Sequence, residues 1–450
     1  MRFFILFMLV GSCLWGCTAM EEQQAQNVKF SPAQISQVID QMTELMVNDV
    51  TNPPLAARFF AYATLAGYEV IVQNDSTYKS MAGILNKYPR IDKPAVTGYS
   101  AELSALLAML ETAKKMQPSG VLLDSFQVRF LDSCRHAGIT DAVIQRSSDY
   151  AQQISKAMLA YAKADKYNRI SNYPRYSPQQ KEGFWYPTPP GYFAPVEPYF
   201  NTVRSFTLDT CIQFKPAPPI AFSTNKASEF YKLLHQNYDN NTHLTPEQQN
   251  IAAFWDCNPF ALQDGGHLQV GRKKISPGAH WMGITGIACQ QAKAGFAKAM
   301  KIHTVVSLGL MDGFIACWDE KFRSNRIRPE TAIRQYLDPM FKPLLQTPPF
   351  PEYLSGHSTI SSTSAVILTY YFGDHFKYSD TVEERYGLPA RTFNSFQEAA
   401  IEAGISRFYG GIHFMDAIDN GRKQGLQVGE WVLGKVERKP QVIAAVKQVK

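Results

Sequence analysis

Apolar residues recur at helical spacing along most of the chain. The clearest stripe repeats at i, i+3, i+4 and i+7 and consists of Leu103, Leu106, Leu107 and Leu110. This spacing places its members on one face of a helix. Long runs of strict apolar–polar alternation, which are typical of half-buried strands, do not occur. The pattern therefore predicts an all-α fold built as a helical bundle.

Helix start signals divide the pattern into two helical regions. Ser31 places an N-cap residue before a proline at the first helical position, and helical signals then continue to about residue 166. The run from Thr245 to Gln248 has the form of a capping box. We assign residues 31–166 to an N-terminal helical region and residues 225–438 to a second helical bundle.

Proline and aromatic residues crowd the segment between these regions, residues 167–224. Residues 184–192 alone read Phe-Trp-Tyr-Pro-Thr-Pro-Pro-Gly-Tyr. Prolines at this density break helices. The segment is therefore predicted to be an ordered connection held by aromatic packing, with a wall of a substrate site as the alternative.

The first 17 residues have the form of an export signal. A positive start at residues 1–2 precedes a short apolar core, and residues 14–17 read Leu-Trp-Gly-Cys. These four residues resemble the bacterial lipobox, which implies lipidation of Cys17; an ordinary signal cut a few residues later is the alternative. We expect residues 18–30 to form a flexible tether. The protein is then exported to the bacterial periplasm or cell envelope and held at the membrane by a lipid anchor.

Charge and cysteine content narrow the class of protein. The formal net charge is only +6 over 450 residues, without a dense basic run interleaved with aromatics, which argues against nucleic-acid binding. No segment beyond the signal is predicted to be long and apolar enough to cross a membrane. Of the seven cysteines, Cys13 and Cys17 belong to the signal. The other five are scattered, and we expect mostly buried thiols with at most one or two disulfides.

Three short stretches in the last third of the chain fit a compact tetrahedral oxyanion. The first contains Lys321 and Arg328, which lie seven residues apart and are followed by Pro329. Two helical turns would let both cations face one way, with the proline ending or kinking that helix. Arginine donates bidentately to an oxyanion and lysine acts as a point charge. Either residue alone would be interpreted as a solvated surface charge.

The second stretch is Ser355, Gly356 and His357, which precede a helical pattern. A helix N-terminus presents free N–H groups and a partial positive charge that suit an anion. Ser355 adds a hydroxyl donor, Gly356 lets the backbone approach closely, and His357 is placed to exchange a proton with the guest. In isolation, the same residues would be a serine N-cap with an incidental histidine.

The third stretch runs from Ser406 to His413. The glycine pair at residues 410–411 should break a helix. Arg407 would then end one helix, and His413 would begin the next near the same point. A neutral imidazole nitrogen of His413 could bond directly to vanadium or phosphorus; a core histidine bonded to backbone is the alternative.

Together the pattern Lys-x6-Arg-Pro, Ser-Gly-His and Ser-Arg-x5-His resembles the vanadium-dependent haloperoxidases. That family shares it with type 2 phosphatidic-acid phosphatases and bacterial acid phosphatases. The motifs occupy residues 321–413 only, but the flank at residues 348–353, Trp318 and the chain length resemble the haloperoxidase branch more than the short phosphatases. The resemblance implies a helical bundle of this type, vanadate as cofactor, and hydrogen peroxide and halide as substrates. Relatives often form homodimers, so a homodimer is expected.

The resemblance also implies a role for each motif residue. His413 would be the axial ligand of the vanadium of vanadate, and His357 the general acid–base. Phe350 and Trp318 would form the halide or substrate environment. Phe350 stands where chloroperoxidase-like members carry Phe and bromoperoxidases carry His. The remaining oxyanion-binding roles fall to Lys321, Arg328, Ser355, Gly356 and Arg407.

Two positions depart from the family pattern. Leu354 replaces the proline that usually precedes Ser-Gly-His, and Ala417 stands where relatives often carry an aspartate four residues after the last histidine. We expect Asp416 to reach the His413 ring by i, i+3 geometry, or else the backbone to fix its tautomer. The other histidines, His280 among them, show no metal-ligand spacing and are predicted to be structural or surface groups.

Two further functions use the same residues. A phosphatase would hydrolyse a phosphate ester through a phosphohistidine at His413, without any cofactor. A lipoprotein that only binds phosphate is the non-enzymatic alternative, and the pair His357 and His413 argues against it because binding alone needs no acid–base partner.

Overall fold

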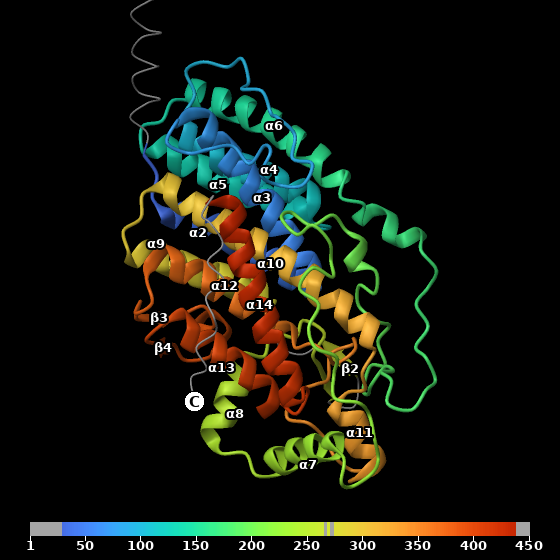
Figure 1. The fold of residues 1–450 in the computed structure, drawn as a ribbon. Coiled ribbons are helices and arrows are strands. Elements are labelled where there is room, and N and C mark those ends of the chain that lie inside the picture. The colour runs from blue at the N-terminus through green and yellow to red at the C-terminus, as the bar shows by residue number, and fades with distance from the viewer. Residues whose placement is uncertain (1–28, 265–267, 271–273, 438–450) are drawn as a thin grey trace, which may run out of the picture.

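The computed structural model describes residues 29–264, 268–270 and 274–437, and it confirms the all-α prediction (Figure 1). In this part of the chain the only strands are two antiparallel hairpins of three-residue strands, β1–β2 and β3–β4. The predicted signal, its lipidated Cys17 and nearly all of the tether lie outside the described residues.

The longest connection between helices joins α6 to α7, and other long connections precede α4, α9, α12 and α13. Their bounds are α2 Pro32–Asn48, α3 Pro53–Asn74, α4 Ala101–Met116, α5 Leu123–His136, α6 Asp141–Lys163, α7 Glu229–Thr242, α8 Pro246–Phe254, α9 Pro277–Gln291, α10 Phe296–Ser324, α11 Pro329–Tyr336, α12 Gly356–Phe372, α13 Phe396–Tyr409 and α14 Met415–Val436. The strands are β1 Leu262–Asp264, β2 Leu268–Val270, β3 Tyr378–Asp380 and β4 Arg391–Phe393, and short 3-10 turns cover Gly120–Leu122, Tyr167–Asn172, Phe200–Thr202 and Glu384–Tyr386.

The long helix α10 joins the two helical regions. It packs against α3 on one side and against α12 and α14 on the other, while α13 packs on both α12 and α8. In Figure 1 the helices α3 to α6 gather at the upper end and α7, α8 and α11 lie at the lower end. One hydrophobic core runs through both regions, because residues from α2 to α14 belong to the same buried cluster.

Local signals set several helix starts as expected. Ser31 forms a complete capping box with Gln34, and Thr245 forms another with Gln248. The leucine stripe from Leu103 to Leu110 is fully buried in α4. Proline also occupies the first turn of α3, α9 and α11, where its missing N–H is not needed.

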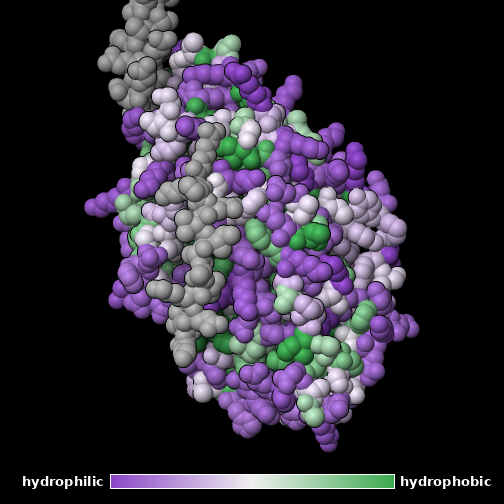
Figure 2. Space-filling view, in the orientation of Figure 1, coloured by the Kyte–Doolittle hydropathy of each residue, from purple (hydrophilic) through white to green (hydrophobic). Residues whose placement is uncertain are grey.

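Within the described residues, two helices are long and apolar enough to cross a membrane by length and composition, contrary to our expectation from the sequence. They are α3 and α10, and 89% and 94% of their most apolar windows are buried inside the protein. A helix that is hydrophobic all round belongs in the centre of a large core. The surface seen in Figure 2 is mostly polar, with small scattered apolar patches.

The proline-rich connection wraps against the second bundle through backbone hydrogen bonds. Trp185 N–H donates to the Asn325 carbonyl at 2.8 Å, and Val196 N–H donates to the Pro349 carbonyl at 3.0 Å. The Val196 carbonyl in turn accepts from Trp318 Nε1 at 3.1 Å. The connection therefore supports segments that carry the oxyanion motifs, as an ordered wrap. All five described cysteines are free thiols, and four of them are buried.

Candidate active site

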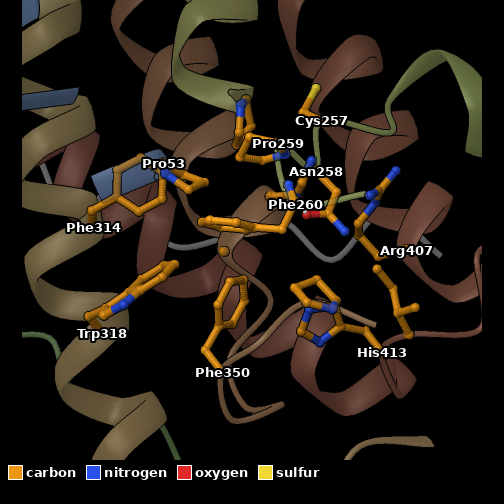
Figure 3. A pocket seen from close by; sticks show the side chains of 15 residues that line it. Pro53, Cys257, Asn258, Pro259, Phe260, Phe314, Trp318, Phe350, Arg407 and His413 are labelled. Atoms are coloured by element: carbon orange, nitrogen blue, oxygen red, sulfur yellow. Dashed lines mark hydrogen bonds between the residues drawn. The ribbon is translucent and has the colours of Figure 1, made fainter. Parts of the chain in front are cut away.

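The three motif stretches meet at one pocket inside the second bundle (Figure 3). Gly356, His357, Arg407 and His413 line it, together with the predicted substrate-side residues Phe350 and Trp318. Lys321, Arg328 and Ser355 are completely buried beside it. All nine site residues predicted from the sequence therefore lie at this cavity or directly behind it.

Lys321 and Arg328 do not share a helix, so that part of our interpretation was wrong. Helix α10 ends at Ser324, and Asn325 follows in the left-handed region with φ 52°. Pro329 then begins α11 instead of ending α10, with Arg328 as its N-cap residue. Asparagine tolerates this conformation better than most residues, which allows the sharp exit that turns Arg328 back toward the pocket.

Lys321 supports the backbone of the segment that precedes α12. Its Nζ donates to the carbonyls of Pro351 at 3.0 Å and Glu352 at 3.1 Å, and also to that of Leu354. Burial lowers the pKa of Lys321 to about 7. Its charge is therefore sensitive to any anion that enters the neighbouring cavity.

Arg328 links two of the motifs directly. Its Nε donates to the Phe350 carbonyl at 2.9 Å, and its Nη1 donates to the Ile412 carbonyl at 2.8 Å and lies 3.2 Å from His413 Nε2. Its Nη2 is buried without a hydrogen-bond partner among the described residues. Burial lowers the pKa of Arg328 to about 9, so it remains a cation at neutral pH.

The Ser-Gly-His stretch forms the predicted helix N-terminus. Ser355 is the N-cap of α12, and its hydroxyl accepts from Ser358 N–H at 3.3 Å. A Cβ at Gly356 would meet only Trp318, at an ordinary 3.4 Å. Protein packing therefore does not require glycine here, whereas a ligand close to the backbone would.

His357 extends from the first turn of α12 into the pocket. Burial, followed by the charge of Arg407, holds the pKa of His357 well below its usual range. Its Nε2 has no hydrogen-bond partner among the described residues. The ring is therefore neutral at physiological pH and has a nitrogen available for a ligand.

Arg407 lies in the last turn of α13 and is held by the end of α8. Its Nη2 donates to the Trp255 carbonyl at 2.6 Å and to the Ala252 carbonyl at 3.3 Å, and its Nε donates to Ser406 Oγ at 3.0 Å. Burial lowers the pKa of this guanidinium. No carboxylate bonds to it among the described residues, so its charge is available to an anion.

His413 lies in the loop between α13 and α14, and its ring orientation is fixed by Glu352. His413 Nδ1 lies 2.8 Å from Glu352 Oε1, which also accepts from Phe414 N–H at 2.9 Å. A carboxylate can only accept, so Nδ1 carries the proton and Nε2 carries the lone pair. Burial, followed by the charge of Arg328, holds the pKa of His413 well below its usual range.

Neither of our expectations for the His413 tautomer is correct. Asp416 bonds to Arg326 through both carboxylate oxygens, at 2.6 Å and 2.8 Å, and not to His413. Arg326 Nε donates in turn to Glu352 at 2.6 Å. A chain of charges, Asp416–Arg326–Glu352, therefore ends on the His413 ring.

Sequence reasoning missed Glu352, Arg326 and the carbonyl of Trp255. Glu352 stands in the proline-rich flank only five residues before His357, so its proximity to one motif was visible. Its partner His413 lies 61 residues further on, and no local spacing connects positions so far apart. Trp255 contributes only a backbone carbonyl, which leaves no signal in the residue type.

The cavity is small and its donors fit a compact oxyanion. The cavity volume is about 30 Å³, which is enough for about two water molecules. Buried arginine and lysine side chains, a helix N-terminus and two unpartnered nitrogen atoms surround it. A tetrahedral oxyanion such as vanadate satisfies these donors, whereas a divalent metal ion would be repelled by the same cations.

Known proteins resemble the chain in sequence and in fold. The family model described as the VCPO second helical-bundle domain matches residues 301–441. The crystal structure of the first bacterial vanadium-dependent iodoperoxidase is 41% identical, with a TM-score of 0.85, and the match covers 91% of this chain and 97% of that one. No curated protein matches the chain.

Two structures of bacterial vanadium-dependent chloroperoxidase show the same fold at lower identity. The holo form is 17% identical with a TM-score of 0.62 and coverage of 91% of this chain and 93% of that one. The apo form is also 17% identical, with a TM-score of 0.63 and coverage of 86% and 95%. With the motif geometry and the 41% identical relative, these matches place the chain in the vanadium-dependent haloperoxidase family, a family of oxidoreductases.

Proposed function

We propose that this enzyme uses bound vanadate to oxidise a halide with hydrogen peroxide. In the net reaction, one halide ion, one hydrogen peroxide and one proton give one hypohalous acid and one water. The observation that supports this best is His413, whose Nε2 accepts a 3.2 Å hydrogen bond from the buried Arg328 cation while Glu352 holds the other nitrogen. The 41% identical relative is a vanadium-dependent iodoperoxidase.

The described residues divide between holding vanadate and moving protons. We assign His413 Nε2 as the atom that binds vanadium, and the cations with the α12 N-terminus as the groups that bind its oxygens. When bound, vanadate supplies a Lewis-acidic centre that activates hydrogen peroxide toward the halide. The oxygen-binding residues in this assignment are Lys321, Arg328, Ser355, Gly356 and Arg407.

His357 is assigned as the general acid–base. It is neutral at physiological pH and has an unpartnered Nε2 in the pocket, so it can accept a proton from hydrogen peroxide and return one to the leaving oxygen. Arg407 stabilises negative charge beside it, and its own hydrogen bonds to Trp255 and Ala252 keep it in place as that charge develops.

Phe350 and Trp318 are assigned to the halide side of the pocket. Their rings lie 5.0 Å apart, and Phe314 packs on Trp318 at 5.3 Å. This wall removes water from an entering ion, which costs least for a large, weakly hydrated halide. Iodide is therefore the expected first substrate, although Phe at position 350 alone resembles the chloroperoxidase-like pattern.

The assay is halide oxidation by vanadate-free protein before and after vanadate is added. Iodide, bromide and chloride are supplied separately with hydrogen peroxide, and hypohalous acid is trapped with a dye. We expect activity only with both vanadate and peroxide. Vanadate-inhibited release of phosphate from a simple ester, without halide oxidation, would instead establish the phosphatase. If the protein shows neither activity, the phosphate-binding lipoprotein becomes the favoured function.

The cellular location and assembly are separate proposals. We infer that the protein is exported, lipidated on Cys17 and held at the membrane, as a homodimer. Mass spectrometry of the mature N-terminus and fractionation of a Cys17→Ser variant test the anchor. The anchor is supported if the Cys17→Ser protein is found in the soluble fraction while the wild-type protein stays in the membrane fraction. Light scattering measures whether the protein is a homodimer.

A further inference from the structure

A second polar cluster lies behind the wall of the pocket. Cys257, His280 and Glu383 are all buried, and they come from the loop after α8, the first turn of α9 and the turn after β3. Their sulfur, nitrogen and oxygen atoms all lie within 4.8 Å of one another. Cys257 also lines the oxyanion pocket, and Figure 3 shows its sulfur pointing away from Phe350 and His413.

The spacing of these atoms fits a metal ion better than hydrogen bonds. His280 Nδ1 lies 3.3 Å from Glu383 Oε1, just beyond the usual range for a hydrogen bond to oxygen, and 4.0 Å from Cys257 Sγ, at the outer limit for a hydrogen bond to sulfur. Tetrahedral Zn²⁺ with its usual bond lengths separates a nitrogen from an oxygen ligand by about 3.3 Å and from a sulfur ligand by about 3.6 Å. The sulfur lies about 0.4 Å too far from the nitrogen for this geometry, and it is within 4.8 Å of the glutamate oxygen.

The opposite side of the His280 ring is arranged as in many metal sites. His280 Nε2 lies 2.8 Å from Asp380 Oδ2, and the other oxygen of Asp380 accepts from Val382 N–H at 3.1 Å. A carboxylate on Nε2–H fixes the tautomer that leaves the Nδ1 lone pair free for a metal. Our sequence interpretation treated His280 as a structural or surface group because it shows no metal-ligand spacing.

We propose that Cys257, His280 and Glu383 bind a divalent metal ion of the zinc class. Thiolate, imidazole and carboxylate together favour Zn²⁺ over Mg²⁺ or Ca²⁺, which prefer oxygen ligands only. Three protein ligands leave the fourth position to a water molecule. Asp380 supports His280 and does not bind the ion.

This metal would stabilise the oxyanion site from behind. Cys257 lies two residues after Trp255, whose carbonyl accepts the 2.6 Å hydrogen bond from Arg407. The His280 ring also stacks on Trp255, with centroids 4.6 Å apart. An ion that fixes Cys257 to α9 and to the β3 turn therefore fixes the turn that holds Arg407. The metal site stands on its own contacts and is independent of the proposed halide chemistry.

Without a metal, the same atoms would form a charged histidine between two acids. Burial opposes that charge, but Asp380, Cys257 and Glu383 together more than offset it and raise the pKa of His280 well above its usual value. Zn²⁺ would displace the Nδ1 proton and the Cys257 thiol proton. The two arrangements differ in metal content and in proton release, so an experiment separates them.

The test uses full-length, tag-free, vanadate-free protein kept reduced. Elemental analysis should find one zinc per chain as purified. After chelation, a Co²⁺ titration should give one equivalent of binding with a thiolate-to-cobalt absorption band in the near ultraviolet. Cys257→Ser should lose the band, and Cys289→Ser, which changes a buried thiol outside the cluster, should keep it.

Two results would overturn the metal site. One is wild-type protein with no stoichiometric metal and no cobalt–thiolate band. The other is a Cys257→Ser protein that folds, by circular dichroism, and keeps the wild-type band. Glu383→Gln provides a milder variant that retains the thiol, and we expect it to bind Co²⁺ at least tenfold more weakly.

Discussion

At the scale of single residues, the site depends on a histidine whose proton is placed by a distant glutamate. Glu352 Oε1 accepts hydrogen bonds from both His413 Nδ1–H and Phe414 N–H, while its other oxygen accepts from Arg326. The carboxylate therefore fixes ring orientation and tautomer together. It also raises the basicity of Nε2, the atom assigned to vanadium.

Glu352→Gln should weaken vanadate binding about 10-fold to 100-fold. The amide keeps the shape of the side chain but removes the charge that stabilises the Nδ1–H tautomer. Equilibrium dialysis with vanadium analysis measures the effect. Asp416→Asn is the control, because it weakens the other end of the Arg326 pair and leaves the 2.8 Å contact of Glu352 with His413 in place. Equal affinity of Glu352→Gln and wild type would contradict this role.

Lys321 should make anion binding depend on pH near neutrality. Burial lowers its pKa to about 7 in the ligand-free protein, so it is mostly charged at pH 6 and mostly neutral at pH 8. An anion favours the charged form, so binding at pH 8 must take up a proton. We expect molybdate, whose charge is constant over this range, to bind about tenfold more weakly at pH 8 than at pH 6.

Calorimetry in buffers of different ionisation enthalpy measures that proton uptake. Lys321→Gln should bind molybdate weakly at both pH values and show no uptake attributable to this group. Wild-type protein with the same molybdate affinity at pH 6 and pH 8 would show that Lys321 does not titrate in this window.

His357 should be needed for turnover and not for vanadate binding. His357→Ala removes the proton acceptor, so we expect halide oxidation to fall about 10²-fold to 10⁴-fold, while vanadate affinity changes little. His375→Ala, at an exposed position away from the pocket, should match wild type. A fully active His357→Ala enzyme would disprove the assigned role.

The sequence predicted which residues form the site better than it predicted how they are arranged. Ser355, Gly356 and His357 are adjacent in the chain, so their residue types were enough to predict that they begin a helix. The partner of His413 could not be found this way, because Glu352 approaches it only through tertiary packing. Arg407 was expected to end a helix and bind the oxyanion, but the carbonyls that orient it belong to Ala252 in α8 and to Trp255 just after it, and no local pattern indicates them.

At the scale of elements, the position of α12 depends on a close approach by α14. Gly421, Gly425 and Gly429 lie one turn apart on α14 and face the α12 backbone. A Cβ on Gly425 would lie 2.1 Å from the Thr359 carbonyl, and one on Gly421 would lie 2.8 Å from the Ser355 carbonyl. This contact places the N-terminus of α12, and thus Ser355, beside the cavity.

Gly425→Ala should destabilise the protein by about 1–3 kcal/mol through overpacking. The new methyl group must push α14 away from α12, so vanadate binding should weaken as well. Gly313→Ala is the matched control, because it changes a buried helical glycine that also faces α12 but meets only ordinary contacts of 3.5 Å or more. Urea unfolding of both variants measures the difference, and equal midpoints would contradict the close-contact account.

Helix starts were predictable because their signals are local. Ser31 and Thr245 cap helices as expected, and Ser355 caps α12, which was our alternative to its role as a hydroxyl donor. The continuous helix through Lys321 and Arg328 was wrong because the left-handed residue that ends α10 is asparagine, not glycine. Asparagine is common in helices' last turns and elsewhere, so it gives a weaker stop signal.

At the scale of the whole molecule, one core carries several buried ionisable groups. The apolar character of α3 and α10 follows from their burial in the core, and our sequence analysis did not identify either segment as apolar enough to span a membrane. His303 is an example of an ionisable side chain whose charged form is destabilised by burial in this core. It lies in α10 with no exposure, its Nδ1 2.8 Å from the Ala299 carbonyl, and burial lowers its pKa to about 4.

Acid should therefore unfold the protein at moderately low pH. The folded-state pKa of His303 lies below its unfolded value of about 6.5, so the unfolded state binds more protons as pH falls from 6.5 toward 4. This group alone lowers the free energy of unfolding by about 3 kcal/mol at pH 4. His303→Leu should reduce the slope of unfolding free energy against pH between 6.5 and 4. An unchanged slope in a folded variant would exclude His303 as a source.

The most direct test of the account is vanadate binding to vanadate-free protein, measured by isothermal titration for wild type and His413→Ala. We predict one equivalent bound by wild type and competed by phosphate, with binding lost in His413→Ala although the variant melts as a folded protein. Stoichiometric vanadate binding that survives in His413→Ala with unchanged affinity would contradict it, because the ring nitrogen would then not hold the ion.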